Sequence, residues 1–181
     1  MKLSSLIKPW TGYAIRHLPS KTGSAQPNPL NFDYCGKSDE NRWNVKGEPT
    51  LYLASEKDVA LAEYARHFEV ARNEGLSKKV HKRKVYRFNI ELSHTLDLCN
   101  SSVCNILSLT DAPSCFTNIK IARATANFLR NATQVQAIFV PSIAFMDNVT
   151  KWCLVIFLEK LNPDHIIHFK EIKPDGYFQI K

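Results

Sequence analysis

Glycine is scarce in this sequence, and several common catalytic motifs are absent. Only 6 of the 181 residues are glycine, and no Gly-rich loop that could wrap around a phosphate group occurs. The patterns H-E-x-x-H, G-x-S-x-G and C-x-x-C are missing as well. Several standard classes of enzyme therefore lose support, and what remains is a dispersed set of candidate residues.

The sequence also lacks the cysteine and histidine spacing of metal sites. Its cysteines number 5, and this odd count argues against a disulfide framework as well as a structural zinc site. Buried, reduced thiols in a cytosolic protein are the favoured interpretation. The 6 histidines are scattered along the chain. We therefore expect no metal ion and no permanently bound cofactor.

Long apolar runs are absent too. The N-terminal stretch MKLSSLIKPW has no apolar core long enough for a signal peptide. No segment approaches the roughly 18 apolar residues of a membrane span. The longest candidates, VQAIFVPSIAF and WCLVIFL, have the length of strands. These absences predict a soluble, cytoplasmic protein without membrane contact.

The charge balance of the chain is basic. Its 24 Lys and Arg residues against 17 Asp and Glu residues give a formal net charge of +7 and a pI near 9.2. Such a balance favours an anionic partner, which includes nucleic acid, anionic lipid, a phosphate-bearing small molecule and an acidic protein. The 44% share of hydrophobic residues is enough for a core, and we expect one domain over residues 1–181.

The apolar pattern predicts more strand than helix. Strands are expected at Thr11–Arg16, Thr50–Ala54, Val85–Leu92, VQAIFVPS and WCLVIFLE, with one or two more in the tail. Helices are expected at about Glu56–Arg72 and within CFTNIKIARATANFLRN. Residues 19–40 have the composition of a long loop, and residues 99–109 are ambiguous. The favoured class is α+β, with flanking helices around a mixed or antiparallel central sheet.

The first predicted helix carries a candidate catalytic carboxylate. Ser55, with Asp58 three residues later, has the pattern of a helix N-cap. An apolar stripe follows at helical spacing, and Glu63 lies at its margin. Such a carboxylate can reach into a cleft. The stripe consists of Leu61, Tyr64, Phe68 and Ala71.

Three separated blocks of the sequence occur in the order found in the RES domain family. They are YAIRHLPS, NRWNVKGEPTLYLASEKDVALAEYARH and VQAIFVPSIAF. The chain resembles that family from about residue 10 to residue 158, which leaves 159–181 as a C-terminal extension. The family is named for an arginine, a glutamate and a serine, which would be Arg16, Glu63 and Ser142 here. In two departures, Asn41 replaces a usual glycine and the stretch after Ser142 is longer.

The resemblance implies a fold like that of ADP-ribosyltransferases and a toxin of a bacterial toxin–antitoxin pair. Such toxins deplete cellular NAD by breaking its nicotinamide–ribose bond, so NAD is the implied substrate. The implied protein partner is a cognate Xre-like antitoxin on another chain. Some relatives transfer ADP-ribose to a protein instead. Water is our default acceptor, while phosphorolysis, protein ADP-ribosylation and homo-oligomerisation stay open.

The matched residues suit the binding of NAD. Arg16 and Arg42 can bind the diphosphate through charge-assisted hydrogen bonds. Tyr52 can stack on the nicotinamide ring, which is cationic while attached to ribose, and Trp43 is a weaker candidate. Taken singly, each of these residues also has a purely structural explanation, as a surface ion-pair partner or as part of the core.

The same resemblance assigns the catalytic roles, with Arg16 included in the catalytic set. Breaking the bond leaves positive charge on the ribose, and the carboxylate of Glu63 can stabilise that charge. Nicotinamide leaves as a neutral molecule, so a strong general acid is not required. Ser142 is expected to position the nicotinamide amide or the ribose by a hydrogen bond rather than to act as a nucleophile.

A basic run, SKKVHKRKVYRF, is the main feature that the resemblance does not explain. It can be a solvated loop that leads into an exposed strand, a nucleic-acid patch or a docking surface for an acidic antitoxin. A non-enzymatic nucleic-acid-binding module built on this run is therefore the competing hypothesis. With NAD as the substrate, direct contact with nucleic acid is not expected.

Overall fold

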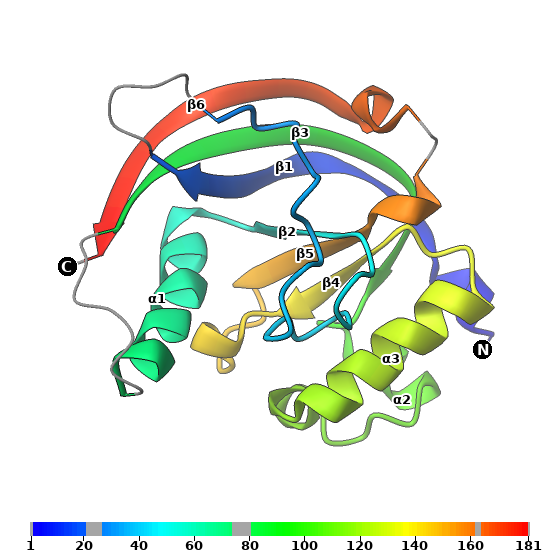
Figure 1. Ribbon diagram of the computed structural model, residues 1–181. Coiled ribbons are helices and arrows are strands. Elements are labelled where there is room, and N and C mark those ends of the chain that lie inside the picture. The colour runs from blue at the N-terminus through cyan, green and yellow to red at the C-terminus, as the bar shows by residue number, and fades with distance from the viewer. Residues whose placement is uncertain (1, 21–26, 74–80, 162–163, 181) are drawn as a thin grey trace.

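The computed structural model describes residues 2–20, 27–73, 81–161 and 164–180. Within these ranges the chain forms six strands and three α-helices, joined by loops and short 3-10 helices (Figure 1). The strands are β1 (Lys8–Pro19), β2 (Thr50–Ala54), β3 (His81–Asp97), β4 (Ala137–Pro141), β5 (Trp152–Phe157) and β6 (Phe169–Ile180). The helices are α1 (Lys57–Asn73), α2 (Ser101–Ile106) and α3 (Ile119–Ala132).

The strands form one mixed sheet that closes on itself. Its order is β1-β2-β5-β4-β3-β6, and β1 also pairs with β3. The pairing of β3 with β4 is parallel, whereas the other pairings are antiparallel. Figure 1 shows the long strands β1, β3 and β6 arching over β2, β5 and β4. The predicted α+β class with a mixed sheet is confirmed.

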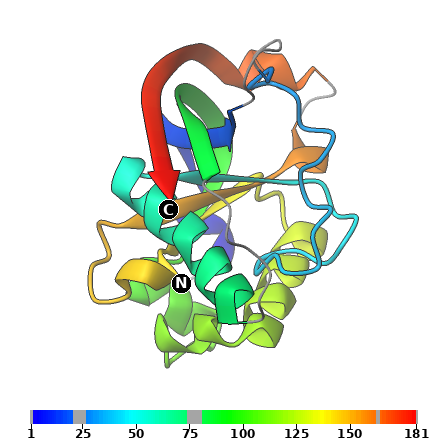
Figure 2. The ribbon, with the colours of Figure 1, turned by 60° about the vertical axis from the view of Figure 1, so that its left-hand side comes forward.

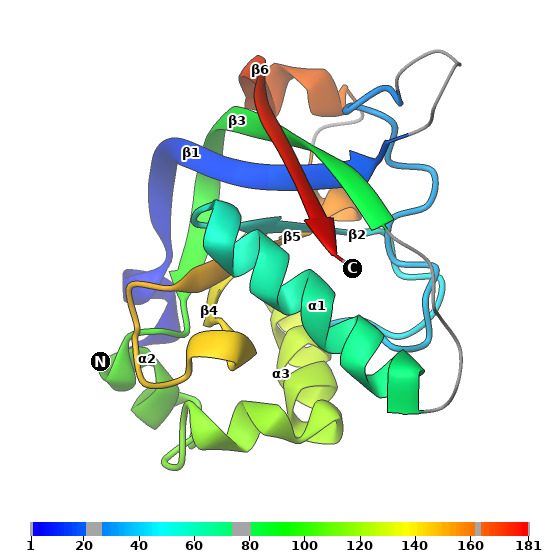
Figure 3. The same ribbon diagram turned by 90° about the vertical axis from the view of Figure 1, so that its left-hand side faces the viewer.

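The core fills the space between these two layers and the space beneath the second one. Alternate residues of β3, such as Phe88 and Ile90, are fully buried against residues of β5, because successive side chains of a strand point to opposite faces. Helices α2 and α3 cover the far side of β4 and β5, where Phe116, Leu129 and Ile138 pack together. Helix α1 lies apart from them, beside β1 and β2, as Figures 1 and 3 show.

Local signals explain the helices beneath the sheet. The side chain of Asn118 accepts a hydrogen bond from the backbone of Lys120 and so caps α3. Asn100 caps α2 in the same way, through the backbone N–H of Ser102. The segment 99–109, which was ambiguous in sequence, therefore contains a short helix.

Most predicted elements are found, although β1 and β3 are longer than predicted. The first strand is longer than expected because its pairing with β3 continues from Lys8 to Pro19. The tail forms the single strand β6, which pairs with β3 along its length. The side chains of Phe68 and Ala71, in the predicted apolar stripe, lie outside the described residues.

The predicted N-cap of α1 is wrong. The helix begins at Lys57, and the carbonyl of Glu56 accepts the backbone hydrogen bond of Ala60. Ser55 therefore lies one residue too early to cap, and its Oγ, which is buried, has no hydrogen-bond partner among the described residues. None of the described helices combines the length and the hydropathy that crossing a membrane requires.

Candidate functional site

A cavity of about 520 Å³ opens between α1, the sheet and the loop that precedes β2. This volume is typical of sites that bind small molecules. Four of the residues proposed from sequence line it, and they come from the loop, β2 and α1. These residues are Arg42, Trp43, Tyr52 and Glu63. The structure thus brings together side chains that are dispersed in the sequence.

The carboxylate of Glu63 is fixed in this cavity by two hydrogen bonds. Its Oε1 accepts one from the hydroxyl of Ser142 at 2.5 Å and one from the backbone N–H of Ala144 at 3.1 Å. Ser142 is fully buried, directly after β4, while its neighbours Pro141 and Ile143 line the cavity. The serine and the glutamate therefore form one unit, in which the serine orients the carboxylate.

Tyr52 contributes its ring to the cavity and uses its hydroxyl to hold the loop. It is the one partly exposed residue of β2, whose other members are buried. The hydroxyl donates to Oδ1 of Asn44 at 2.7 Å and accepts from the backbone N–H of Trp43 at 3.0 Å. Burial raises the pKa of the Tyr52 phenol well above its ordinary value, so the group stays neutral at physiological pH.

Trp43 is mainly a core residue. Only 3% of its surface is exposed, and its ring packs on that of Phe116 with centroids 5.0 Å apart. Trp43 touches the cavity, but most of its ring is already committed to the cluster under α3. Tyr52 is therefore better placed than Trp43 to stack on a ligand.

Arg42 lines the cavity with its guanidinium anchored at one end. Its Nη1 donates to the carbonyls of Phe116 and Thr117, both at 2.8 Å. Burial lowers the pKa of Arg42, and the nearby carboxylate of Glu63 raises it. Since the ordinary pKa of an arginine lies far above physiological pH, the side chain keeps its charge. The two bonds hold one terminal nitrogen and fix the plane of the group.

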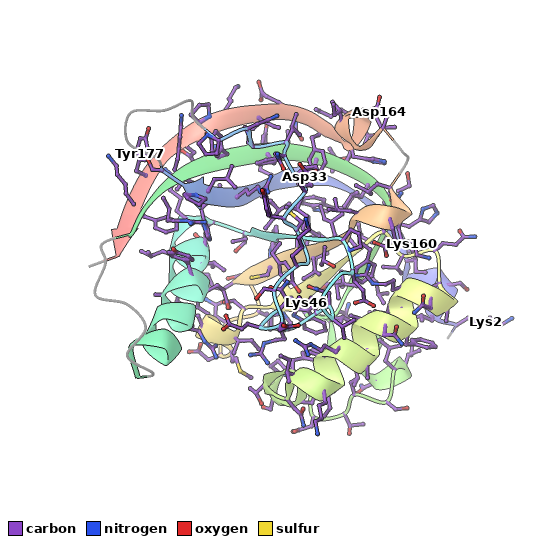
Figure 4. The ribbon with its side chains drawn as sticks, viewed as in Figure 1. Lys2, Asp33, Lys46, Lys160, Asp164 and Tyr177 are labelled. Carbon is purple, nitrogen blue, oxygen red and sulfur yellow. The ribbon has the colours of Figure 1, made fainter. Side chains whose placement is uncertain are left out.

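Arg16 is not brought into the cavity, in contrast to its expected contact with substrate. Its neighbours Ile15 and His17 line the cavity, so the alternation of β1 turns Arg16 to the opposite face. There its guanidinium donates to the carbonyls of Pro29 and Asn31 and lies over the ring of Phe32. The loop that contains these partners lies against the long strands, as the labelled Asp33 in Figure 4 shows.

The loop held by Arg16 continues into the contacts that place Tyr52. The carbonyl of Gly36 accepts from the side chain of Asn44, which in turn accepts from Tyr52. Gly36 has φ +83°, and a Cβ there would lie 1.8 Å from the carbonyl oxygen of Glu48. Only glycine fits such a position. Arg16 is thus connected to the cavity wall through the loop rather than through a ligand.

A family model decides which proteins this chain is related to. The model of the RES domain matches residues 16–176. The chain belongs to the RES domain family. The matched range covers Ser142 and all of the lining residues named above except Ile15.

The fold of this RES domain is shared with a solved structure. A chain in the crystal structure of the M. tuberculosis MbcT–MbcA toxin–antitoxin complex superposes with a TM-score of 0.61 at 14% sequence identity. The match covers 98% of this chain and 89% of that one, and it agrees with the expected ADP-ribosyltransferase-like fold. No curated protein matches the sequence.

The cavity residues of the RES domain that sequence reasoning missed include His17, Tyr64 and Arg83. Nε of Arg83 donates to Nδ1 of His17 at 3.1 Å, and the guanidinium lies 4.5 Å from the centre of the Tyr64 ring. His17 could have been found as the neighbour of Arg16 on the other face of β1. Arg83 is concealed in the basic run, where nothing in the sequence distinguishes it from the lysines beside it.

The cavity also contains a cysteine, which has the properties of an unreactive thiol. Burial, followed by the nearby charge of Glu63, raises the pKa of Cys153 well above its ordinary value. A protonated thiol is a weak nucleophile. Among the described residues no cluster of His, Cys, Asp or Glu side chains is suited to hold a metal ion. The chemistry of the site rests on its carboxylate, its cations and its aromatic rings.

Proposed function

We propose that this RES domain is the toxin of a toxin–antitoxin pair and that it cleaves the nicotinamide–ribose bond of NAD. The observation that carries the proposal is the oriented carboxylate of Glu63 in a cavity that also holds Arg42 and Tyr52. Membership of the RES domain family and the fold shared with a chain of a toxin–antitoxin complex support the biological setting.

Glu63 acts on the charge that develops at the ribose. The bond between C1′ and the nicotinamide nitrogen breaks, and nicotinamide leaves as a neutral molecule with the bonding electrons. A carboxylate about 4 Å from the positive ribose stabilises it by about 4 kcal/mol at an effective dielectric constant of 20. That energy corresponds to about a thousandfold in rate. Glu63 then accepts the proton of the water that adds to C1′, which gives ADP-ribose.

The other residues of the cavity hold NAD in place for this step. The ring of Tyr52 stacks on the cationic nicotinamide, and the guanidinium of Arg42 binds a phosphate oxygen. Ser142 does not touch the substrate in this arrangement, because its hydroxyl is buried and bonded to Glu63. It acts as a positioning residue for the carboxylate, and Arg16 as a positioning residue for the loop.

Water is the proposed acceptor of ADP-ribose, and the cytoplasm, where NAD is available, is the proposed place of action. Transfer to a protein uses the same bond cleavage and differs only in the acceptor. The proposed partner is an antitoxin on another chain, and the basic character of this chain suits an acidic partner surface. The nucleic-acid alternative gains no support from Arg83, which faces the cavity.

The products formed from NAD test this function. Purified protein incubated with NAD should release nicotinamide and ADP-ribose in equal amounts, as measured by mass-resolved chromatography. ADP-ribose bound to the protein would identify transfer, and ADP-ribose phosphate would identify phosphorolysis. Intact NAD after prolonged incubation would contradict the proposal.

A further inference from the structure

Strand β3 carries one member of the basic run into the cavity. Among the described cations of the run, Arg83 lines the cavity, whereas Lys82 and Lys84 point to the other face of the strand. There Lys82 lies over the ring of Tyr177, which Figure 4 labels on the outer strand β6, and Lys84 lies over that of Tyr86. Arg83 therefore has a different environment from its neighbours in sequence.

The contacts of Arg83 fix the plane of its guanidinium. Its Nε–H donates to His17, and its face lies on the ring of Tyr64. The bond needs a lone pair on Nδ1, so His17 is neutral with its proton on Nε2. His17 is itself held between Tyr64 and Phe178, whose ring centres lie 4.9 and 5.1 Å from its own. The bond to His17 uses Nε and leaves the two terminal nitrogens, which are the pair that binds oxyanions, to the phenol of Tyr64 and to a ligand.

The partners of Arg83 differ from those of the other described arginines. Arg130 and Arg87 face carboxylates, and Arg16 donates to backbone carbonyls. Among the described residues Arg83 instead contacts the imidazole of His17 and the phenol of Tyr64, whose pKa burial raises. Both rings are neutral. A cation that is oriented but not neutralised by such partners remains available to an anion.

We infer that Arg83 is a substrate-binding residue, whose terminal nitrogens bind a phosphate oxygen of the ligand in the role expected of Arg16. This inference rests on the proposed function, because NAD supplies the diphosphate. Arg42 and Arg83 reach the cavity from different walls, the loop before β2 and strand β3. Two cations on different walls can hold the two phosphates of one diphosphate, and this arrangement selects diphosphate-bearing substrates over the phosphate-free nucleoside.

The test compares two substrates that share the scissile bond. Replacing Arg83→Gln should raise the KM for NAD by about 10- to 100-fold with little change in kcat, because a charge-assisted hydrogen bond is lost. Cleavage of nicotinamide riboside, which has no phosphate, should be unchanged. Arg87→Gln removes the same charge from the same strand outside the cavity and should behave as wild type. Equal losses on both substrates, or an NAD effect no larger than that of Arg87→Gln, would overturn the inference.

A binding measurement separates this inference from the proposed function. If the wild type released no nicotinamide, the proposed function would fail, and the affinity for ADP measured by calorimetry would judge Arg83 alone. ADP should then bind the wild type about 10- to 100-fold more tightly than Arg83→Gln. Equal affinities, or no binding to the wild type, would overturn the assignment. If Arg83→Gln did not fold, Arg83→Lys would replace it. This variant should lose less affinity for ADP, because it keeps the positive charge and loses only the planar, two-pronged hydrogen bonding of the guanidinium.

Discussion

The hydroxyl of Ser142 and the carboxylate of Glu63 define the site at the scale of single residues. The serine is fully buried, and its bond to Glu63 is the short, charge-assisted kind. A second serine, Ser55, is only partly buried, but its Oγ is buried and has no hydrogen-bond partner among the described residues. One serine hydroxyl is bonded to the carboxylate and the other is unbonded, so replacing each by alanine gives a matched pair of variants.

Ser142→Ala should slow the release of nicotinamide about tenfold, because Glu63 keeps its bond to Ala144 but loses the stronger one. Ser55→Ala should leave the rate unchanged and the free energy of unfolding equal or higher, since it removes an unsatisfied buried group. Steady-state kinetics and urea unfolding of both variants test this pair. Equal rates in the two variants would remove Ser142 from the mechanism.

The phenol of Tyr52 predicts a specific loss of stability in alkali. Its pKa is raised in the folded state above the ordinary value of 10.0, so the stability it contributes is complete below pH 10. Above that pH the unfolded chain loses the proton and the folded protein keeps it. The free energy of unfolding then falls by about 1.4 kcal/mol per pH unit until the folded pKa is reached. Denaturant unfolding between pH 9 and 11 should show that the free energy of unfolding declines less steeply with pH in Tyr52→Phe than in the wild type. Parallel declines in the two proteins would contradict a raised pKa of Tyr52.

At the scale of elements, the loop between β1 and β2 connects Arg16 to the cavity. Arg16 binds its first half, and Gly36 joins that half to Asn44 and so to Tyr52. The backbone at Gly36 passes so close to Glu48 that no side chain fits. The geometry of Tyr52 and Arg42 therefore depends on a loop that is fixed from the opposite face of the sheet.

Gly36→Ala should destabilise the protein by about 2 kcal/mol or more, because it combines strain at positive φ with a backbone clash. Gly47 is the matched control, since it also has positive φ but a Cβ there meets no atom within 4 Å. Gly47→Ala should therefore cost less. Thermal unfolding of the two variants measures the difference. Equal melting temperatures would show that the close approach at Gly36 does not determine the cost of adding a side chain there.

The elements were largely predictable from sequence, while the faces they present were not. The strand Thr50–Ala54 is found with its predicted bounds because a short apolar run lies between Pro49 and the polar residues after it. The side of β1 on which Arg16 lies depends on where the chain folds back, and no local pattern encodes this. Glu63 and Tyr52 could be proposed because they lie in the block that resembles the family. His17 could have been proposed as the neighbour of Arg16, whereas nothing in the sequence distinguishes Arg83 within the basic run.

At the scale of the whole molecule, closure of the sheet creates the cavity. Because β1 pairs with both β2 and β3, residues as distant in sequence as His17, Arg83 and Val140 line one space. Figures 2 and 3 show the end of β6 reaching helix α1, in agreement with the contact between Phe178 and Tyr64, which lines the cavity. A ligand that bridges these walls binds the folded protein and not the unfolded chain.

NAD should therefore stabilise the whole fold when it is not consumed. In the Glu63→Gln variant, NAD at 100 times its Kd should raise the melting temperature by about 5–10 °C, because such binding adds about 2.7 kcal/mol. At the same NAD concentration, this increase in melting temperature should be smaller in the double variant that also carries Arg42→Gln. Differential scanning fluorimetry measures both, and an unchanged melting temperature at saturating NAD would argue against the cavity as the NAD site.

The most direct test of the central claim is the rate of nicotinamide release from NAD by Glu63→Gln. The variant keeps the size of the side chain and its place in the cavity but loses the negative charge, so the rate should fall about 100- to 1,000-fold while the fold is retained. Glu56→Gln, an equal change at an exposed position just before the same helix, should keep the wild-type rate. A Glu63→Gln protein that releases nicotinamide as fast as the wild type would contradict the account.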